Sequence, residues 1–77
     1  MTLEEIRKKI DAIDAQLLPL FEARMDCARE VAAVKKEAGL PVLNPEREKA
    51  ILDRVAGQAG EYAGAARVLY STLMEVS

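Results

Sequence analysis

The first half of the chain carries apolar residues at alternating spacings of three and four, which is the pattern of one helix face. These positions are Leu3, Ile6, Ile10, Ile13, Leu17 and Leu20. Thr2 and Glu5 form a capping-box pattern before this stretch, and Gly39 is a natural stop after it. The pattern therefore predicts a helix that ends at Ala38 and is about 54 Å long at 1.5 Å per residue.

Pro19 lies inside this stretch, where a proline removes a backbone hydrogen bond and crowds the preceding turn. The apolar spacing continues in phase across it, so we expect one kinked helix rather than two separate helices. A helix of this length exceeds the diameter of a compact domain built from so short a chain. Its apolar face is therefore predicted to pack against another chain.

Two shorter helices are predicted in the second half of the chain, after a short extended connector that begins at Gly39. Asn44 followed by Pro45 is typical of a helix start, with Asn as the cap and Pro at the first helical position. The Gly- and Ala-rich segment from Gly57 to Gly64 is expected to loosen the chain before a third helix at about 62–76. The inner faces of these helices are expected to hold Ile51, Leu52, Val55, Ala66, Leu69, Leu73 and Val76. The fold class is therefore all-α, with one long and two shorter helices in a single domain, 1–77.

Two cations interrupt the apolar face of the long helix. Arg24 falls on the apolar stripe, and Lys35 lies eleven residues later, on nearly the same side and about 16 Å further along the axis. Ala28 and Ala32 lie between them, so the side chains on this part of the helix face are small. Because a buried guanidinium is costly unless it is paired, these cations predict a pocket for an anion.

Two further charged residues are candidates for the same pocket. Glu48 shares the inward side of the second helix, although an acid that stabilises the helix dipole is the alternative interpretation. Arg7 lies about 100° away from Arg24 around an ideal helix, which favours a solvated surface residue. If two long helices pair antiparallel, however, Arg7 could reach the pocket of the other chain.

The composition narrows the possible functions. The net charge is −2 with both signs spread along the chain, which argues against a nucleic-acid arm or a polybasic membrane anchor. No apolar run approaches the ~20 residues of a membrane span and no signal-peptide pattern is present, so we expect a cytoplasmic protein. With no His and with Cys27 as the only cysteine, neither a disulfide within the chain nor a His/Cys metal site is expected. Oligomerisation is then the favoured way to stabilise so short a chain.

Three segments together resemble the all-helical chorismate mutases. They are Leu3–Asp14 with its Arg-Lys-Lys-Ile-Asp run, Ala23-Arg24 followed by Lys35, and Pro41–Glu48 with its Pro-Glu-Arg-Glu run. The resemblance covers essentially the whole chain. It implies an intertwined homodimer of three-helix subunits that converts chorismate, a dicarboxylate, to prephenate in phenylalanine and tyrosine biosynthesis. It implies no cofactor and no metal, because the reaction is an intramolecular Claisen rearrangement.

The resemblance also assigns roles to the cations. By position, Arg7 matches an arginine that the partner subunit donates to each site. Arg24 and Arg47 match carboxylate-binding residues, and Lys35 matches the cation that binds a carboxylate and the ether oxygen of the substrate. Arg24, Lys35 and Glu48 are the expected catalytic residues.

Three other positions match substrate-binding residues of the family. Glu48 matches the residue that accepts the substrate hydroxyl, and Asn44 stands near that hydroxyl where the family often has Asp. Ser77 matches a serine of the third helix. The family usually carries Gln or Glu one turn beyond this serine, whereas this sequence stops at Ser77 with the apolar pattern still running. We therefore expect a piece of a longer helix, as in a mutase domain fused to a prephenate dehydratase or another shikimate-pathway enzyme.

Other functions stay open at the level of sequence. An isochorismate pyruvate lyase or an aminodeoxychorismate mutase on this scaffold would keep the same cations, although the Glu48 acceptor favours a substrate with a hydroxyl. A non-catalytic dimerisation or regulatory module would explain the helices but not the position of Arg24 on the apolar stripe.

Overall fold

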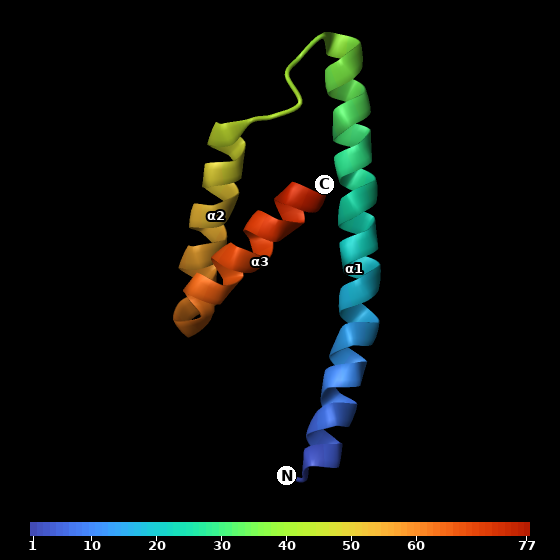
Figure 1. The fold of residues 1–77 in the computed structure, drawn as a ribbon, viewed down its shortest axis with the longest axis vertical. Helices are drawn as coiled ribbons and strands as arrows, with labels where there is room; N and C mark the ends of the chain where they lie inside the picture. Colours follow the sequence, from blue (N-terminus) through green and yellow to red (C-terminus); the bar gives the residue numbers. More distant parts are fainter. The chain divides into compact units, whose positions relative to one another are not determined.

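The computed structural model describes all residues from Met1 to Ser77, and all of its regular structure is helical. The elements are α1 (Leu3–Ala38), α2 (Pro45–Ala59), the 3₁₀ turn η1 (Gly60–Tyr62) and α3 (Ala63–Val76), as labelled in Figure 1. The predicted all-α class is thereby confirmed. Internal contacts divide the chain into two units, Met1–Val31 and Ala32–Ser77, which are described separately below.

The predicted capping box starts α1. The backbone N–H of Glu5 donates to Thr2 Oγ1, and the backbone N–H of Thr2 donates to Glu5 Oε2, each over 3.2 Å. These bonds satisfy two donors that a helix start would otherwise leave open. The helix then continues through Pro19, which confirms one helix rather than two.

The apolar face of α1 is exposed in the single chain. Ile13, Leu17 and Leu20 are 60%, 54% and 68% exposed, and no residue of α1 is buried. The same face carries further exposed residues at Leu3, Ile6, Ile10, Val31 and Val34. An apolar stripe of this length is far more than the scattered apolar residues of an ordinary surface. No helix of the chain combines the length and the apolar character that crossing a membrane requires.

The end of α1 is a Schellman motif at the predicted glycine. Gly39 has φ +71°, its N–H donates to the Lys36 carbonyl over 3.2 Å, and the Leu40 N–H donates to the Lys35 carbonyl over 2.8 Å. These bonds satisfy two carbonyls of the last turn. They also direct the chain into residues 39–44, which we call the connector.

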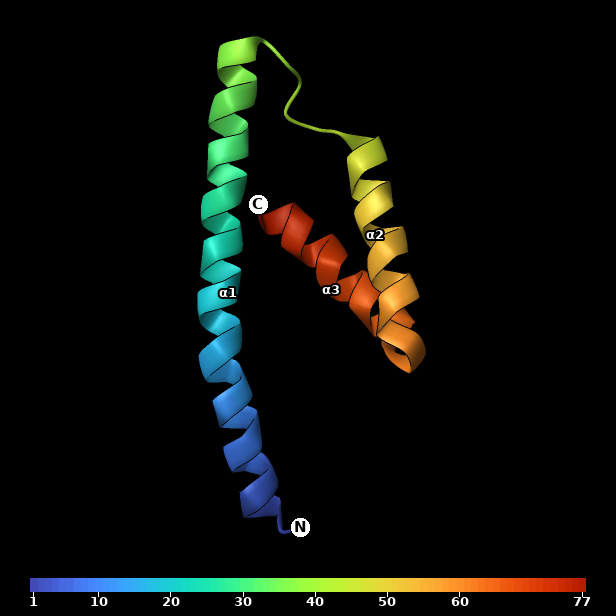
Figure 2. The same cartoon turned by 180° about the vertical axis from the view of Figure 1, so that it is seen from behind.

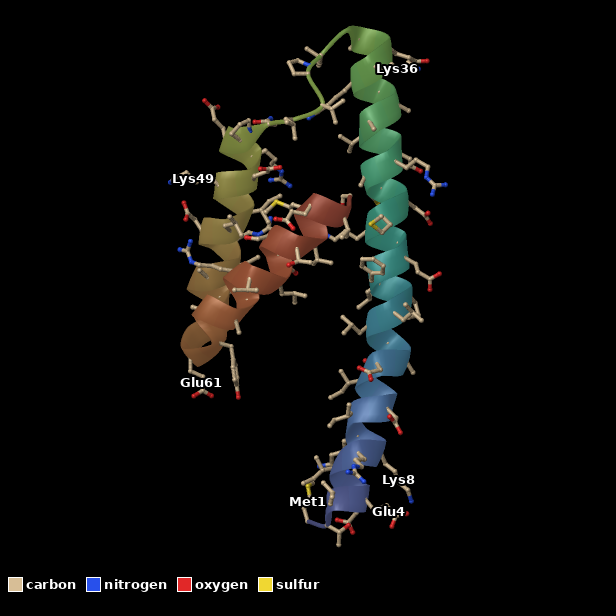
Figure 3. The ribbon with its side chains drawn as sticks, viewed as in Figure 1. Met1, Glu4, Lys8, Lys36, Lys49 and Glu61 are labelled. Carbon is tan, nitrogen blue, oxygen red and sulfur yellow. The ribbon has the colours of Figure 1, made fainter.

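The apolar core of the second unit lies between α2 and α3, and both views of the ribbon show α3 folding back from the η1 turn along α2 (Figures 1 and 2). Val55 is the only buried side chain of the molecule, and Ile51 and Leu52 are half-buried, as the spacing predicted. Asp53 joins the two helices, because its carboxylate lies 3.0 Å from Lys49 Nζ and 3.6 Å from Arg67 Nη2. Glu61 projects outward from the η1 turn (Figure 3).

The break between α2 and α3 is narrower than the sequence predicted. Gly57 lies inside α2 and Gly64 inside α3, and only Gly60 of the three has a positive φ, +59°. The prediction of a loosened segment from Gly57 to Gly64 was wrong, because the alanines of this segment favour helix strongly enough to carry the glycines between them.

The inner face of α3 also differs in part from the prediction. Ala66 and Leu73 are half-buried, but Leu69 and Val76 are 51% and 53% exposed. Tyr70 is half-buried instead. A tyrosine ring covers a large apolar area when it packs against a neighbouring element.

We expect Gly39→Ala to lower the free energy of unfolding by about 1 kcal/mol, because a left-handed conformation costs an L-residue about that much. A Cβ at Gly39 would meet no atom within 4 Å, so the cost is conformational and not steric. Gly57→Ala is the matched control, since its Cβ also meets no atom within 4 Å but the residue lies inside α2. Gly57→Ala should raise the free energy of unfolding by about 0.5–1 kcal/mol. Urea unfolding at one fixed protein concentration measures both, and effects of the same sign would contradict this account.

Candidate functional site

A hollow of about 480 Å³ lies in the second unit, where the connector joins the end of α1 to the start of α2. Its walls are Lys35, Leu40, Pro41, Leu43, Asn44, Pro45 and Glu46. The structure thus brings together two of the site residues predicted from the sequence, Lys35 and Asn44. Lys35, Asn44 and Glu46 are its polar lining residues, and the other four are apolar, which is a common composition of sites for small organic ligands.

Lys35 is tied to the connector at both of its ends. Its backbone carbonyl accepts the Leu40 N–H, and its Nζ donates to the Val42 carbonyl over 3.0 Å. The side chain is half-buried and forms no ion pair. Because an ammonium has three N–H groups, the bond to Val42 fixes its position and leaves donors for a ligand.

Asn44 fixes the start of α2, as the sequence predicted. Its Oδ1 accepts the backbone N–H of Arg47 over 3.1 Å, and its backbone carbonyl accepts the N–H of Glu48 over 3.1 Å. Pro45, at the first helical position, has no N–H to satisfy. Arg47 and Glu48 follow in the first turns of α2, where Arg47 is exposed and Glu48 is half-buried, and neither lines the hollow.

The remaining predicted residues lie outside the hollow. Ser77 follows α3, and its Oγ donates to the Leu73 carbonyl over 2.5 Å. Arg7 and Arg24 belong to the first unit, where Arg7 is exposed and Arg24 is half-buried. Their expected association with Lys35 and Glu48 therefore stays a prediction.

Two groups at the hollow were not predicted from the sequence. The Val42 carbonyl belongs to the backbone, so no side-chain pattern reports that it holds Lys35. Glu46 lines the hollow two residues after Asn44. Glu46 belongs to the Pro-Glu-Arg-Glu run. Because Asn44 was predicted to cap the helix, the sequence could have placed Glu46 in its first turn.

Comparison with known proteins places these residues in a family. The family model described as Chorismate mutase type II matches residues 6–77. The chorismate mutase of Methanocaldococcus jannaschii is 51% identical over 53 residues, which are 69% of this chain and 54% of that protein. The bifunctional chorismate mutase/prephenate dehydratase of Aquifex aeolicus is 40% identical over 53 residues, which are 69% of this chain and 15% of that protein.

A third relative carries a different name. The 4-amino-4-deoxychorismate mutase of Streptomyces venezuelae is 32% identical over 60 residues, which are 78% of this chain and 58% of that protein. The chain thus spans only about half the length of the Methanocaldococcus and Streptomyces relatives in these matches. No solved structure matches the chain.

Proposed function

Because this chain belongs to the chorismate mutase type II family, we propose that it converts chorismate to prephenate in the cytoplasm, within phenylalanine and tyrosine biosynthesis. The reaction breaks an ether C–O bond and forms a C–C bond in the same molecule, so it needs no co-reactant. The observation that carries the proposal is the Lys35 ammonium, which is held at a fixed position in a hollow that it shares with Asn44.

Lys35 acts in this proposal on the oxygen of the breaking bond. Negative charge develops there as the C–O bond lengthens, and a donor that is already in place stabilises it without reorganising. The bond to the Val42 carbonyl supplies that preorganisation. Arg7, Arg24 and Arg47 bind the two carboxylates, since a guanidinium matches a planar carboxylate with two parallel hydrogen bonds. Holding both carboxylates keeps the substrate in the compact conformer that reacts.

We further propose an intertwined homodimer whose sites combine residues of both chains. Val55 is the only buried residue of the single chain, which is too small a core for a stable fold of 77 residues. The exposed face of α1 is the surface that a second copy would cover. If two α1 helices pair antiparallel, the start of one lies near the middle of the other, so Arg7 meets the partner's Arg24.

A second candidate is the mutase reaction on the 4-amino analogue of chorismate. The Streptomyces relative, which bears that name, is the observation in its favour. Incubating the full chain with chorismate and, separately, with 4-amino-4-deoxychorismate, and identifying each product, separates the alternatives. We expect prephenate from chorismate, and release of pyruvate would indicate a lyase. Conversion of the 4-amino compound alone would indicate the second candidate, and conversion of neither would indicate a non-catalytic helical module.

Replacing Lys35 by Ala should lower kcat by on the order of 10²–10³, which is the usual effect of removing one preorganised donor of this kind. Lys36→Ala is the matched control, because Lys36 lies in the same last turn of α1 (Figure 3) but is exposed and outside the hollow. Steady-state kinetics on both variants make the comparison. Equal kcat values for the Lys35 variant and the wild type would refute the electrostatic role.

The chain should sediment as a dimer at micromolar concentration, because the face of α1 from Leu3 to Leu20 has no cover in one chain. Replacing Ile13 and Leu17 by Gln should shift the equilibrium toward monomer and lower the thermal unfolding temperature. Sedimentation equilibrium measures the first effect and circular dichroism the second. A folded wild-type monomer at these concentrations would contradict the proposal.

Mixing an Arg7→Ala chain with an Arg24→Ala chain should restore activity that neither variant has alone. Each heterodimer has one site with both arginines replaced and one intact site. Random exchange makes about half of the dimers heterodimers, so about a quarter of the wild-type activity should return. Native mass spectrometry verifies the exchange. No recovery after verified exchange would place both arginines in the site of one chain.

A further inference from the structure

The apolar stripe of α1 repeats with a period of seven residues along almost the whole helix. Eight of its ten positions are aliphatic and 40–68% exposed, and the other two are Arg24 and Cys27, of which the cysteine is free and exposed. A sustained seven-residue repeat, with alternating steps of three and four, is the pattern by which two helices pack as a coiled coil. The positions of the stripe are Leu3, Ile6, Ile10, Ile13, Leu17, Leu20, Arg24, Cys27, Val31 and Val34.

Two antiparallel copies of α1 can pair along this stripe in several registers, which differ by one heptad or about 10 Å. In one of them, which we call the centred register, the first position of the stripe faces the last. Leu3 then faces the partner's Val34, Leu17 faces the partner's Leu20, and every position has a partner. A shift of one heptad in either direction leaves the end of the stripe uncovered. The centred register therefore buries the most apolar surface.

Pro19 fits the same register. It has no N–H to bond the Ala15 carbonyl and crowds that turn, and helices bend at such residues. Two bent helices pack along their full length when their bends lie at the same level. In the centred register the two copies of Pro19 lie side by side at the middle of the stripe. A shift of one heptad would separate the two bends by about 10 Å.

The charges beside the stripe distinguish the registers further. In the centred register Lys9 faces the partner's Glu30, and two-fold symmetry forms this contact twice. Both side chains are exposed, and neither forms an ion pair within the chain. A shift of one heptad would set Asp14 against the partner's Asp14 or, in the other direction, Arg7 against the partner's Lys35. Charge complementarity thus selects the same register as apolar burial.

The stripe also favours antiparallel over parallel pairing. In a parallel pair each position faces its own copy, so Arg24 would meet the partner's Arg24 within the seam. Two like charges that face each other away from water are costly. In the centred register Arg24 instead faces the partner's Ile13, whose apolar surface can cover the stem of the arginine.

We infer that two copies of α1 pair antiparallel in the centred register, and that ion pairs between Lys9 and the partner's Glu30 fix this register. The inference rests on the proposed homodimer and specifies which residues meet in it. It has a consequence for the site, because Arg7 then lies opposite the partner's Ala28, one turn after Arg24. Since Ala28 is small, the guanidinium of Arg7 has room beside the partner's Arg24. The register thereby decides whether arginines of two chains can bind one ligand.

Reversing each charge on a separate chain tests the ion pair. Lys9→Glu and Glu30→Lys homodimers each contain two like-charged contacts, whereas the heterodimer of these two chains contains two opposite-charged contacts. The heterodimer should make up about nine-tenths of the dimers, against about half for random pairing, at the usual strength of exposed ion pairs. Effects within each chain cancel, because the same two chains make up all three dimers. Native mass spectrometry with one chain isotope-labelled measures the fractions.

A matched pair of variants controls for net charge. Lys8→Glu and Glu22→Lys make the same charge changes at exposed positions on the side of α1 away from the stripe. Their heterodimer should stay near half of the dimers. A fraction near half for the Lys9 and Glu30 variants, or an equal rise in the control, overturns the ion pair.

Cys27 reports the register directly, because facing residues of two packed helices come within the range of a disulfide. Ile10→Cys faces the partner's Cys27 in the centred register, so mild oxidation should link the full chains into covalent dimers. Leu3→Cys and Leu17→Cys would face Cys27 only in the two shifted registers. The wild type would link through Cys27 only in a parallel pair. These three should remain unlinked in a non-reducing denaturing gel, and adding Cys27→Ser to Ile10→Cys should abolish its link.

The outcomes separate this inference from the proposed function. A dimer that links through Leu3→Cys, through Leu17→Cys or in the wild type, or that links in none of the variants, overturns the register, while turnover of chorismate still supports the function. A folded wild-type monomer overturns the homodimer and this inference together, even if it converts chorismate. A dimer with the expected link and heterodimer fraction that leaves chorismate unchanged refutes the reaction and supports the register.

Discussion

The last turn of α1 is the constraint on which the candidate site depends. Gly39 accepts a left-handed conformation, and the two backbone bonds of the Schellman motif turn the chain away from the helix axis. The turn brings the Val42 carbonyl within reach of Lys35 Nζ, and Asn44 follows two residues later at the edge of the same hollow. A helix that continued past Gly39 would carry Val42 onward along its axis and remove the partner that holds Lys35.

The same chain leaves its largest apolar surface without an internal partner. Six apolar side chains lie on one face of α1 and are at least 40% exposed: Leu3, Ile6, Ile10, Ile13, Leu17 and Leu20. Burial of this face against a second copy would supply the apolar area that Val55 and its neighbours lack. In that arrangement the helix that closes the dimer is also the helix that carries Arg7 and Arg24.

The sequence determined most of the fold because its signals are local. The capping box at Thr2, the stop at Gly39 and the cap at Asn44 each depend on a few neighbouring residues, and each is found where predicted. The exposure of Leu69 could not be predicted, since it depends on how α3 rotates against α2. For the same reason periodicity could identify Lys35 as a candidate but could not identify the Val42 carbonyl, which is brought close only by the path of the connector.

At the start of α2, few backbone N–H groups are open to hydrogen-bond a ligand. Pro45 has no N–H, and the N–H groups of Arg47 and Glu48 donate to Asn44. The backbone N–H of Glu46 is therefore the one donor of the first turn that remains open. The partner of Lys35 is likewise a neutral carbonyl, which positions the ammonium without cancelling its charge as a carboxylate would. The Val42 carbonyl therefore leaves the charge of Lys35 uncancelled, while Glu46 places one negative charge in the wall of the same hollow.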